Sequence, residues 1–334
     1  SRHLGFDLLR ILSAVAVIVI HISAPIMTTP SLYQQGDAFW WTSNILDSLS
    51  RFSVPMFVIF SGYSFSLFVN SSDFFKKSKD KFIKLIKITL FWSVVFIAFR
   101  ILKGDFSNIS GIVDIFMLAV AKPLLAGLPY FHLWYLYMAL GLFFIAIYAV
   151  PLLDRVTNEA RKPLLFSVMI ITLLFSFQNY YYDNKLLFVF WFIEYMFYFM
   201  FGLYLPRLGF RLNKNLALVG FMLFVLFNSI LVSLMVGVYG PDRGQYFFEF
   251  VSPFVMLQTL FLFYVFKKIN TESPKFIIRL SRLTLPVYLV HPFFTEVAVS
   301  YVRESHSVGY VIFGIAISVI LSFILSFLLS KVPG

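Results

Sequence analysis

Long apolar runs separated by short polar breaks recur along the whole chain and predict membrane-spanning helices. A helix needs about 20 predominantly apolar residues to cross a bilayer core. The runs that suit such a span lie near residues 6–27, 45–70, 82–102, 133–151, 163–180, 187–206, 215–238, 246–268, 284–302 and 307–331. Residues 110–121 are apolar but too short to cross, so they predict a re-entrant or interfacial segment. The pattern predicts an all-α, polytopic membrane helix bundle of about ten transmembrane helices, and a single membrane domain over residues 1–334.

Positively charged residues alternate between successive connections of these predicted helices. The connection 28–44 has no lysine or arginine, whereas 71–87 holds six lysines. Rich and poor connections continue to alternate as far as the last short turn, which holds Arg303 alone. Because lysine and arginine gather in cytoplasmic loops, the alternation predicts that both termini are cytoplasmic.

The first predicted span carries three ionisable residues on one face. Arg10 and His21 are eleven positions apart, which is about three turns at ~3.6 residues per turn, and Asp7 joins the same face. Ionisable groups inside a span are costly and usually face protein or a wet cavity. We therefore expect all three to face the interior of the bundle, with His21 in the outer half of the membrane.

Composition supports the membrane assignment and limits the chemistry. The chain is 60% hydrophobic and only 13% charged, against about 25% charged residues in an average soluble domain. The absence of cysteine excludes thiol nucleophiles and thiolate metal sites, and without any zinc-binding pattern no metal is predicted. Basic cytoplasmic loops explain the net charge of +11, so membrane lipid is an expected partner and nucleic acid is not.

The residues of the first span have structural and chemical interpretations. His21 can be held by hydrogen bonds within the bundle, but beside Arg10 and Asp7 it is a candidate general base or transient acyl acceptor. Arg10 can pair with Asp7 at i,i+3, or its guanidinium can hold the phosphate or carbonyl of a ligand. Both interpretations of Arg10 stay open.

The second span adds a further basic residue and a break. Arg51 follows Asp47 by four positions, which suits an ion pair on one helix face. Pro55 predicts a kink because proline removes a helix hydrogen bond. Ser61 and Gly62 belong to a small, hydroxylated segment, which indicates either close helix packing or a slot for a slender substrate arm.

A basic strip lies at the predicted cytoplasmic mouth. Lys81, Lys84 and Lys87 recur every three residues, so they drift slowly round one side of a helix. Such a strip suits contact with anionic lipid or with the phosphates of a cofactor.

Two aromatic residues mark the predicted outer end of the fourth span. His132 and Trp134 lie there with several tyrosines. Aromatic residues are ordinary at a membrane interface, but their faces also suit the apolar faces of sugars, so we expect the two residues to contact substrate.

The ninth predicted span, near residues 284–302, contains prolines that predict a second break. Pro286 and Pro292 bracket Tyr288 and His291, and Glu296 follows. Two prolines in one span predict a kinked or broken helix, which is tolerated where the backbone is buried or lines a cavity.

Four segments together resemble the membrane acyltransferase-3 family, whose members acylate bacterial surface glycans and related acceptors. The segments are FDLLRILSAVAVIVIH, SRFSVPMFVIFSGYSF, FHLWYLYMALGLFFIAIYAVPLL and LTLPVYLVHPFF. The resemblance implies that His21 is the catalytic histidine and Arg10 its basic partner. Where the family usually has an arginine pair, this chain has Lys81 and Lys84, which hold phosphate without the bidentate fork of arginine.

The resemblance implies an acetyl-CoA-dependent O-acetyltransferase of the bacterial inner membrane. His21 would take the proton of a sugar hydroxyl, and Arg51 or Tyr288 would stabilise the oxyanion. The expected cofactor-binding residues are Lys81, Lys84, Lys87, Arg10, Ser61 and Tyr63. The expected substrate-binding residues are His132, Trp134, His291 and Glu296.

Other functions fit the same buried charges. A secondary transporter would use them as a proton relay, and a flippase or glycan polymerase would need no coenzyme A site. The expected partners of the enzyme are acyl-CoA, a surface glycan or lipid-linked saccharide, and membrane lipid, and an oligomer is compatible with the sequence.

Overall fold

The protein is a polytopic helical membrane bundle. The computed structural model describes residues 3–28, 36–105, 111–182, 187–209, 212–241 and 243–331, and within them no β-strand forms beyond an isolated bridge between His3 and Glu272. In these ranges nine helices are long and apolar enough to cross a membrane, and a bent helix pair at Lys275–Val290 and Pro292–Ser305 makes a tenth. The prediction of about ten spans is confirmed.

The chain forms two compact units. The first unit comprises Ser1–Phe57, Ser176–Tyr181 and Gly209–Gly334, and the second comprises Val58–Phe175 and Tyr182–Leu208. The prediction of one membrane domain over 1–334 is not tested by this division, because helices α3 and α8 each continue from one unit into the other.

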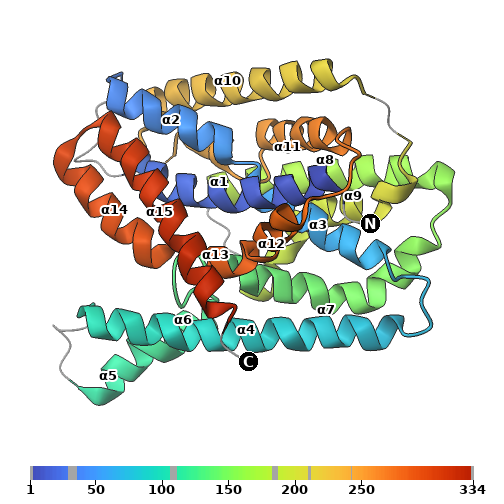
Figure 1. Cartoon of the computed structure of the whole chain (residues 1–334), viewed down its shortest axis with the longest axis horizontal. Helices are drawn as coiled ribbons and strands as arrows, with labels where there is room; N and C mark the ends of the chain where they lie inside the picture. The colour runs from blue at the N-terminus through green and yellow to red at the C-terminus, as the bar shows by residue number, and fades with distance from the viewer. Residues whose placement is uncertain are drawn as a thin grey trace. The chain divides into compact units, whose positions relative to one another are not determined.

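The first unit holds most of the N- and C-terminal helices (Figure 1). Its helices are α1 (Leu4–Thr28), α2 (Ala38–Ser50), the start of α3 (Ser53–Ser66), α10 (Lys214–Tyr239), α11 (Pro253–Lys267), α12 (Lys275–Arg282), α13 (Thr284–Val290), α14 (Pro292–Ser305) and α15 (Val308–Leu329). A 3-10 turn at Tyr246–Phe248 precedes α11.

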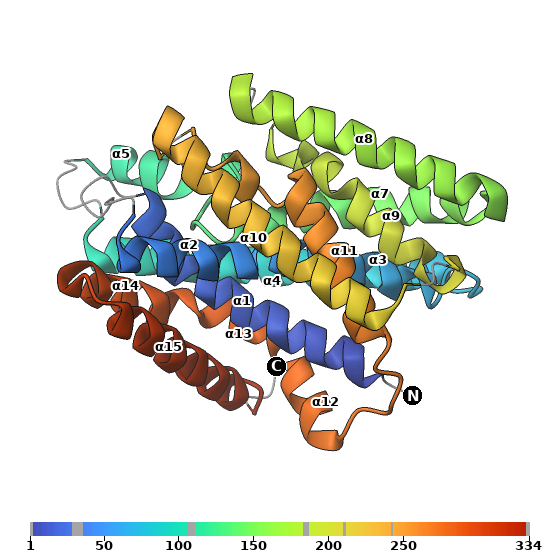
Figure 2. The ribbon, with the colours of Figure 1, turned by 90° about the horizontal axis from the view of Figure 1, so that it is seen from above.

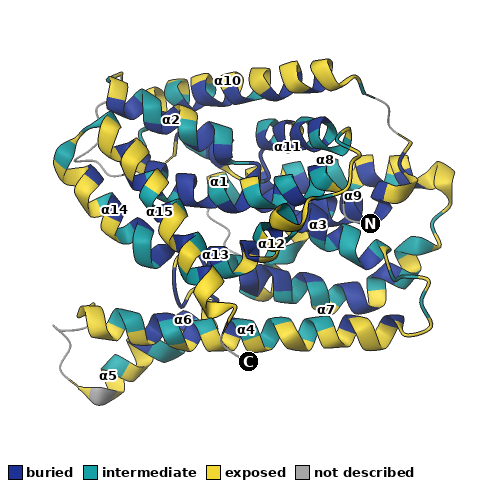
Figure 3. Ribbon diagram, viewed as in Figure 1, coloured by how far each residue is buried: buried dark blue, intermediate teal, exposed yellow. Residues whose placement is uncertain are grey.

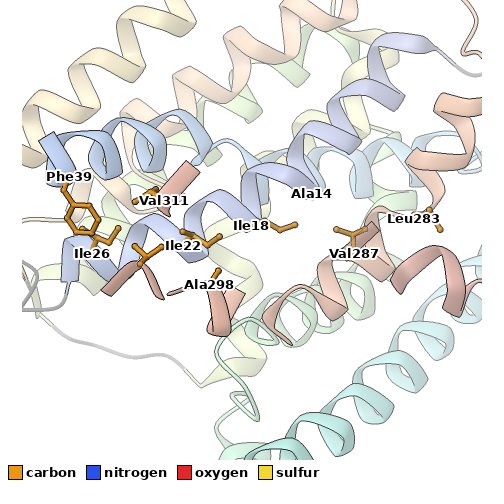
Figure 4. Packing of buried hydrophobic residues seen from close by; sticks show 10 residues of the cluster. Ala14, Ile18, Ile22, Ile26, Phe39, Leu283, Val287, Ala298 and Val311 are labelled. Carbon is orange, nitrogen blue, oxygen red and sulfur yellow. The ribbon is translucent and has the colours of Figure 1, made fainter. Parts of the chain in front are cut away.

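Helix α1 is the element on which the first unit is built. It contacts α2, α11, α12, α13, α14 and α15, and α2 runs along it for much of its length (Figure 2). Ala14, Ile18 and Ile22 on α1 pack with Val287 of α13 and Ala298 of α14 in one apolar cluster (Figure 4). Lipid tails are as apolar as these side chains, so close packing and not removal from water holds the helices together. This packing fixes the face of α1 that carries the predicted polar residues.

Two proline breaks divide spans in the first unit. Helix α2 ends at Ser50 and α3 begins at Ser53. The break contains Arg51, whose carbonyl lies four residues before Pro55 and cannot receive a helix hydrogen bond from it. Helices α13 and α14 meet at His291 and Pro292 with a bend of 62° between the two parts of the pair. Both breaks expected from the prolines are confirmed.

The second unit contains the middle of the chain. Its helices are most of α3, α4 (Phe74–Lys103), α5 (Ile112–Phe116), a π-helical turn at Met117–Ala121, α6 (Lys122–Leu125), α7 (Trp134–Asp154), most of α8 (Asn158–Tyr182), a 3-10 helix at Phe188–Tyr195, α9 (Met196–Tyr204) and a 3-10 turn at Leu205–Arg207. The predicted segment 110–121 coincides with short helices, and residue 110 lies outside the described residues.

Helix α15 shows how the spans divide their faces. Its buried residues are Val311, Gly314, Ser318, Ser322 and Ser326, spaced by three or four, and the remainder of the helix is largely exposed (Figure 3). A single buried stripe with exposed leucine, isoleucine and phenylalanine elsewhere is typical of a helix that faces both protein and lipid.

Candidate active site

Asp7 is the most firmly held polar residue of α1. Its carboxylate accepts hydrogen bonds from the hydroxyls of Ser273 and Ser281, each at 2.6 Å. Arg10 approaches the same carboxylate only to 3.7 Å, and its side chain is 28% exposed. The predicted pairing of Arg10 with Asp7 is present, but the shorter contacts of Asp7 are to the serines.

His21 lies beside a second histidine. The rings of His21 and His291 stack with centroids 5.0 Å apart and planes 20° from parallel. His291 is fully buried, whereas His21 is only partly buried. Between Arg10 and His21, the intervening residues Ala14 and Val17 of the same face are buried. The face that carries His21 therefore points into the first unit, as expected.

His291 stands at the break between α13 and α14. Its Nδ1 atom lies 2.6 Å from the carbonyl oxygen of Tyr288, and the two rings are 5.8 Å apart. Tyr288 is itself buried. The structure thus brings His21, His291 and Tyr288, three of the predicted site residues, into one cluster.

Arg51 belongs to the same unit and stands at the break between α2 and α3. Its Nη2 atom donates to the Asp47 carboxylate at 2.7 Å, and Asp47 is fully buried. The guanidinium also lies over the rings of Phe248 at 4.6 Å and Phe250 at 5.5 Å.

The predicted cofactor-binding lysines lie in the second unit and differ in exposure. Lys81 is half-buried, donates to the Ser64 hydroxyl at 2.9 Å, and lies over the rings of Phe65 and Phe68 at 5.1 Å and 4.6 Å. Lys84 and Lys87 are exposed. Lys81 is therefore part of the packing of α3 on α4, while the other two lysines present their charges outward.

The segment of α3 that contains Ser61 and Gly62 packs closely against a neighbouring helix. Close packing was one of the two interpretations of this segment. Gly62 contacts α9 so tightly that a Cβ atom there would lie 1.9 Å from the carbonyl oxygen of Phe199. Ser61 shares a hydrogen bond with the hydroxyl of Tyr135. Tyr63 is partly buried, and a role for Ser61 or Tyr63 in binding a cofactor stays a prediction.

The other predicted substrate-binding residues are spread over both units. His132 is fully buried and is surrounded by the rings of Phe96, Tyr130 and Phe131. Trp134 is partly buried, with its ring 5.8 Å from that of Tyr195.

Glu296 lies on α14, five residues after His291, and is partly buried. Binding of substrate by Glu296 stays a prediction.

Sequence reasoning missed the partners that come from distant parts of the chain. Ser273 and Ser281 are 266 and 274 positions from Asp7, and Phe248 is far from Arg51 in the sequence. The only weak signal was their position, with Ser273 just before the basic segment Lys275–Arg282 and Ser281 inside it. In the described part of the chain no three histidine, aspartate or glutamate residues gather as a metal ion would require, and the expected absence of a metal stays a prediction.

Comparison with known proteins gives one match. The sequence model of the acyltransferase-3 family, described as "Acyltransferase domain", matches residues 3–327. No curated protein and no solved structure matches the chain.

Proposed function

Because the chain belongs to the acyltransferase-3 family, we propose that this membrane acyltransferase is an O-acetyltransferase. It moves an acetyl group from cytoplasmic acetyl-CoA to a hydroxyl of a surface glycan, or of its lipid-linked precursor, in the bacterial inner membrane. Its sequence segments resemble those of the enzyme that O-acetylates enterobacterial common antigen, so this glycan is the first acceptor to test.

The observation that carries the proposal is the stacked pair of His21 and His291. A neutral imidazole is the usual general base near neutral pH. His21 is the partly exposed member of the pair, so it is the one that a sugar hydroxyl can reach. In this mechanism His21 takes the hydroxyl proton as the oxygen attacks the thioester, and the thiolate of coenzyme A leaves.

The oxyanion of the tetrahedral intermediate needs a donor. Arg51 suits this role because its buried Nε–H has no hydrogen-bond partner among the described residues, while its Nη2 is held by Asp47. A donor already fixed by an ion pair loses little freedom when charge develops, which is the basis of oxyanion stabilisation. Tyr288 is the alternative donor in this proposal.

The donor is proposed to dock through its phosphates on the basic strip of α4. Lys84 and Lys87 are the exposed members and would meet the phosphates as point charges, with Lys81 already engaged by Ser64. Arg10, which is partly exposed near the predicted cytoplasmic end of α1, is proposed as the basic partner of His21 on the same helix.

The test is acetyl transfer by purified protein in lipid nanodiscs. Because the chain has no cysteine, any free thiol released from acetyl-CoA comes from coenzyme A and can be measured directly. We expect His21→Ala to lower the rate by about 10²–10⁴-fold, the usual contribution of a general base, while acetyl-CoA still binds. His306→Asn is the matched control, since this exposed histidine lies at the end of α14 in a left-handed conformation that asparagine tolerates.

Two results would contradict the proposal. If His21→Ala kept the rate of the wild type, the role given to His21 would be wrong. If the wild-type protein neither bound acetyl-CoA nor released thiol with any glycan acceptor, the donor assignment would fail, and transport through buried charges would become the better explanation.

A further inference from the structure

The position of His291 follows from the proline after it. Pro292 has no N–H, so it cannot donate to the carbonyl of Tyr288 four residues earlier, which a regular helix would require. The Nδ1 atom of His291 lies 2.6 Å from that carbonyl oxygen. A carbonyl oxygen can only accept, so Nδ1 must carry the proton of this hydrogen bond. The helix break therefore sets both the ring orientation and the tautomer of His291.

The ring of His291 is also held on its other sides. It is fully buried, and its neighbours Val287 and Val290 are fully buried as well. The Tyr288 ring packs at 5.8 Å on one side, and His21 stacks on it at 5.0 Å. The His291 ring is therefore held in one orientation and offers His21 a rigid surface on which to stack.

His21 also stands four residues before a proline of its own helix. Pro25 of α1 cannot donate to the carbonyl of His21, and the His21 side chain is partly exposed and stacks on the His291 ring. Stacked rings at this separation attract each other beyond the effect of the area they bury, which favours one rotamer of His21 over another by about 2–10-fold.

We propose that His291 is a positioning residue for His21, and not a residue that binds substrate. The carbonyl of Tyr288, released by Pro292, locks the ring of His291, and that ring in turn holds the imidazole of His21 in the orientation used for proton transfer. The catalytic part of this inference rests on the proposed function. The locked tautomer and the stack do not, because they are properties of the protein without substrate.

Kinetics separate positioning from substrate binding. A misplaced base lowers the rate of the chemical step, and a displacement near 1 Å can cost about 10²-fold. We expect His291→Ala to lower kcat by roughly 10–10²-fold and to leave KM for acetyl-CoA and for the acceptor near the wild-type values. A residue that binds substrate would raise KM instead.

Two conservative variants separate the parts of the mechanism. His291→Phe keeps an aromatic face against His21 but loses the donor to Tyr288. His291→Asn keeps a donor near the Nδ1 position but loses the ring. If the stack positions His21, kcat should fall least in His291→Phe and as far in His291→Asn as in His291→Ala.

A spectroscopic measurement is independent of turnover. The chain has five histidines, so ¹⁵N-histidine spectra of the protein in nanodiscs can be assigned by single substitutions. We expect His291 to show the neutral Nδ1–H tautomer, and the His21 signal to shift and broaden in His291→Ala but less in His291→Phe. His306→Asn serves as the control and should leave the His21 signal unchanged.

The possible results separate the positioning role of His291 from the proposed acetyltransferase function. An Nε2–H tautomer at His291, an unchanged His21 signal in His291→Ala, or a rise in KM with constant kcat would overturn the positioning role. A locked tautomer and a shifted His21 signal in a protein without acetyl-CoA turnover would keep the structural part and refute the proposed function instead.

Discussion

The carboxylate of Asp7 illustrates how a single buried charge can fix a helix. Asp7 is almost completely buried, and a buried charge is tolerated only when hydrogen bonds replace its water. Ser273 and Ser281 supply two such bonds at 2.6 Å each, and both serines flank or belong to α12. Asp7 therefore links α12 to α1, while Arg10 pairs with the same carboxylate at 3.7 Å.

We expect Ser281→Ala to destabilise the protein more than Ser273→Ala. Ser281 is buried and Ser273 is only partly buried, so water can replace the second hydroxyl but not the first. A lost hydrogen bond to a buried charge costs about 1.5–3 kcal/mol, which should lower Tm by several degrees in Ser281→Ala. Thermal unfolding in detergent, followed by tryptophan fluorescence, measures this. Equal Tm values for Ser281→Ala and the wild type would contradict the docking role of Asp7.

At the scale of elements, both proline breaks stand at residues of the candidate site. Pro55 releases the carbonyl of Arg51, and Pro292 releases the carbonyl of Tyr288, because each proline lacks the N–H that would bond four residues back. Arg51 thus ends α2, and His291 ends α13. At a helix break a side chain can point in a direction that a continuous helix would not allow. The side chains at these two breaks are Arg51 and His291.

Local features of this kind could be predicted from the sequence. The apolar runs gave the spans, the prolines gave the breaks, and the spacing of Asp47 and Arg51 gave their ion pair, because each depends on neighbours along one helix. The stack of His291 on His21 and the serines on Asp7 depend on which helices pack together. No spacing within a single span contains that information, so neither the stack nor the two serines could be predicted, and substrate binding by His291 stays a prediction.

The crossing of α3 and α9 gives a prediction about an element. A Cβ atom on Gly62 would lie 1.9 Å from the carbonyl oxygen of Phe199, and one on Gly202 would lie 2.0 Å from that of Ile59. Small residues let membrane helices approach this closely. We expect Gly62→Ala and Gly202→Ala each to cost about 1–3 kcal/mol through overpacking, seen as a lower Tm.

Gly209→Ala is the matched control for these variants, because a Cβ atom there meets nothing within 4 Å. Its Tm should equal that of the wild type. If Gly62→Ala melted at the same temperature as Gly209→Ala, the two helices would have to be farther apart than the structure places them.

At the scale of the whole molecule, the proposed chemistry needs a defined orientation in the membrane. The exposed lysines of α4 can meet cytoplasmic acetyl-CoA only if the start of that helix lies on the cytoplasmic side. The alternation of connections rich and poor in lysine and arginine predicts this orientation. It also predicts that the connections containing Arg243 and Glu304 lie on the opposite side.

The absence of cysteine makes this orientation directly measurable, since any introduced cysteine is the only thiol of the chain. Lys79, Lys275, Arg243 and Glu304 are all exposed, so replacing each by cysteine should leave folding intact. A membrane-impermeant maleimide added to intact spheroplasts should label Arg243→Cys and Glu304→Cys, and should label Lys79→Cys and Lys275→Cys only after the membrane is permeabilised. Labelling of Lys79→Cys in intact spheroplasts would place the basic strip outside, where no coenzyme A is available, and would remove the donor site from the proposal while leaving the histidine pair in place.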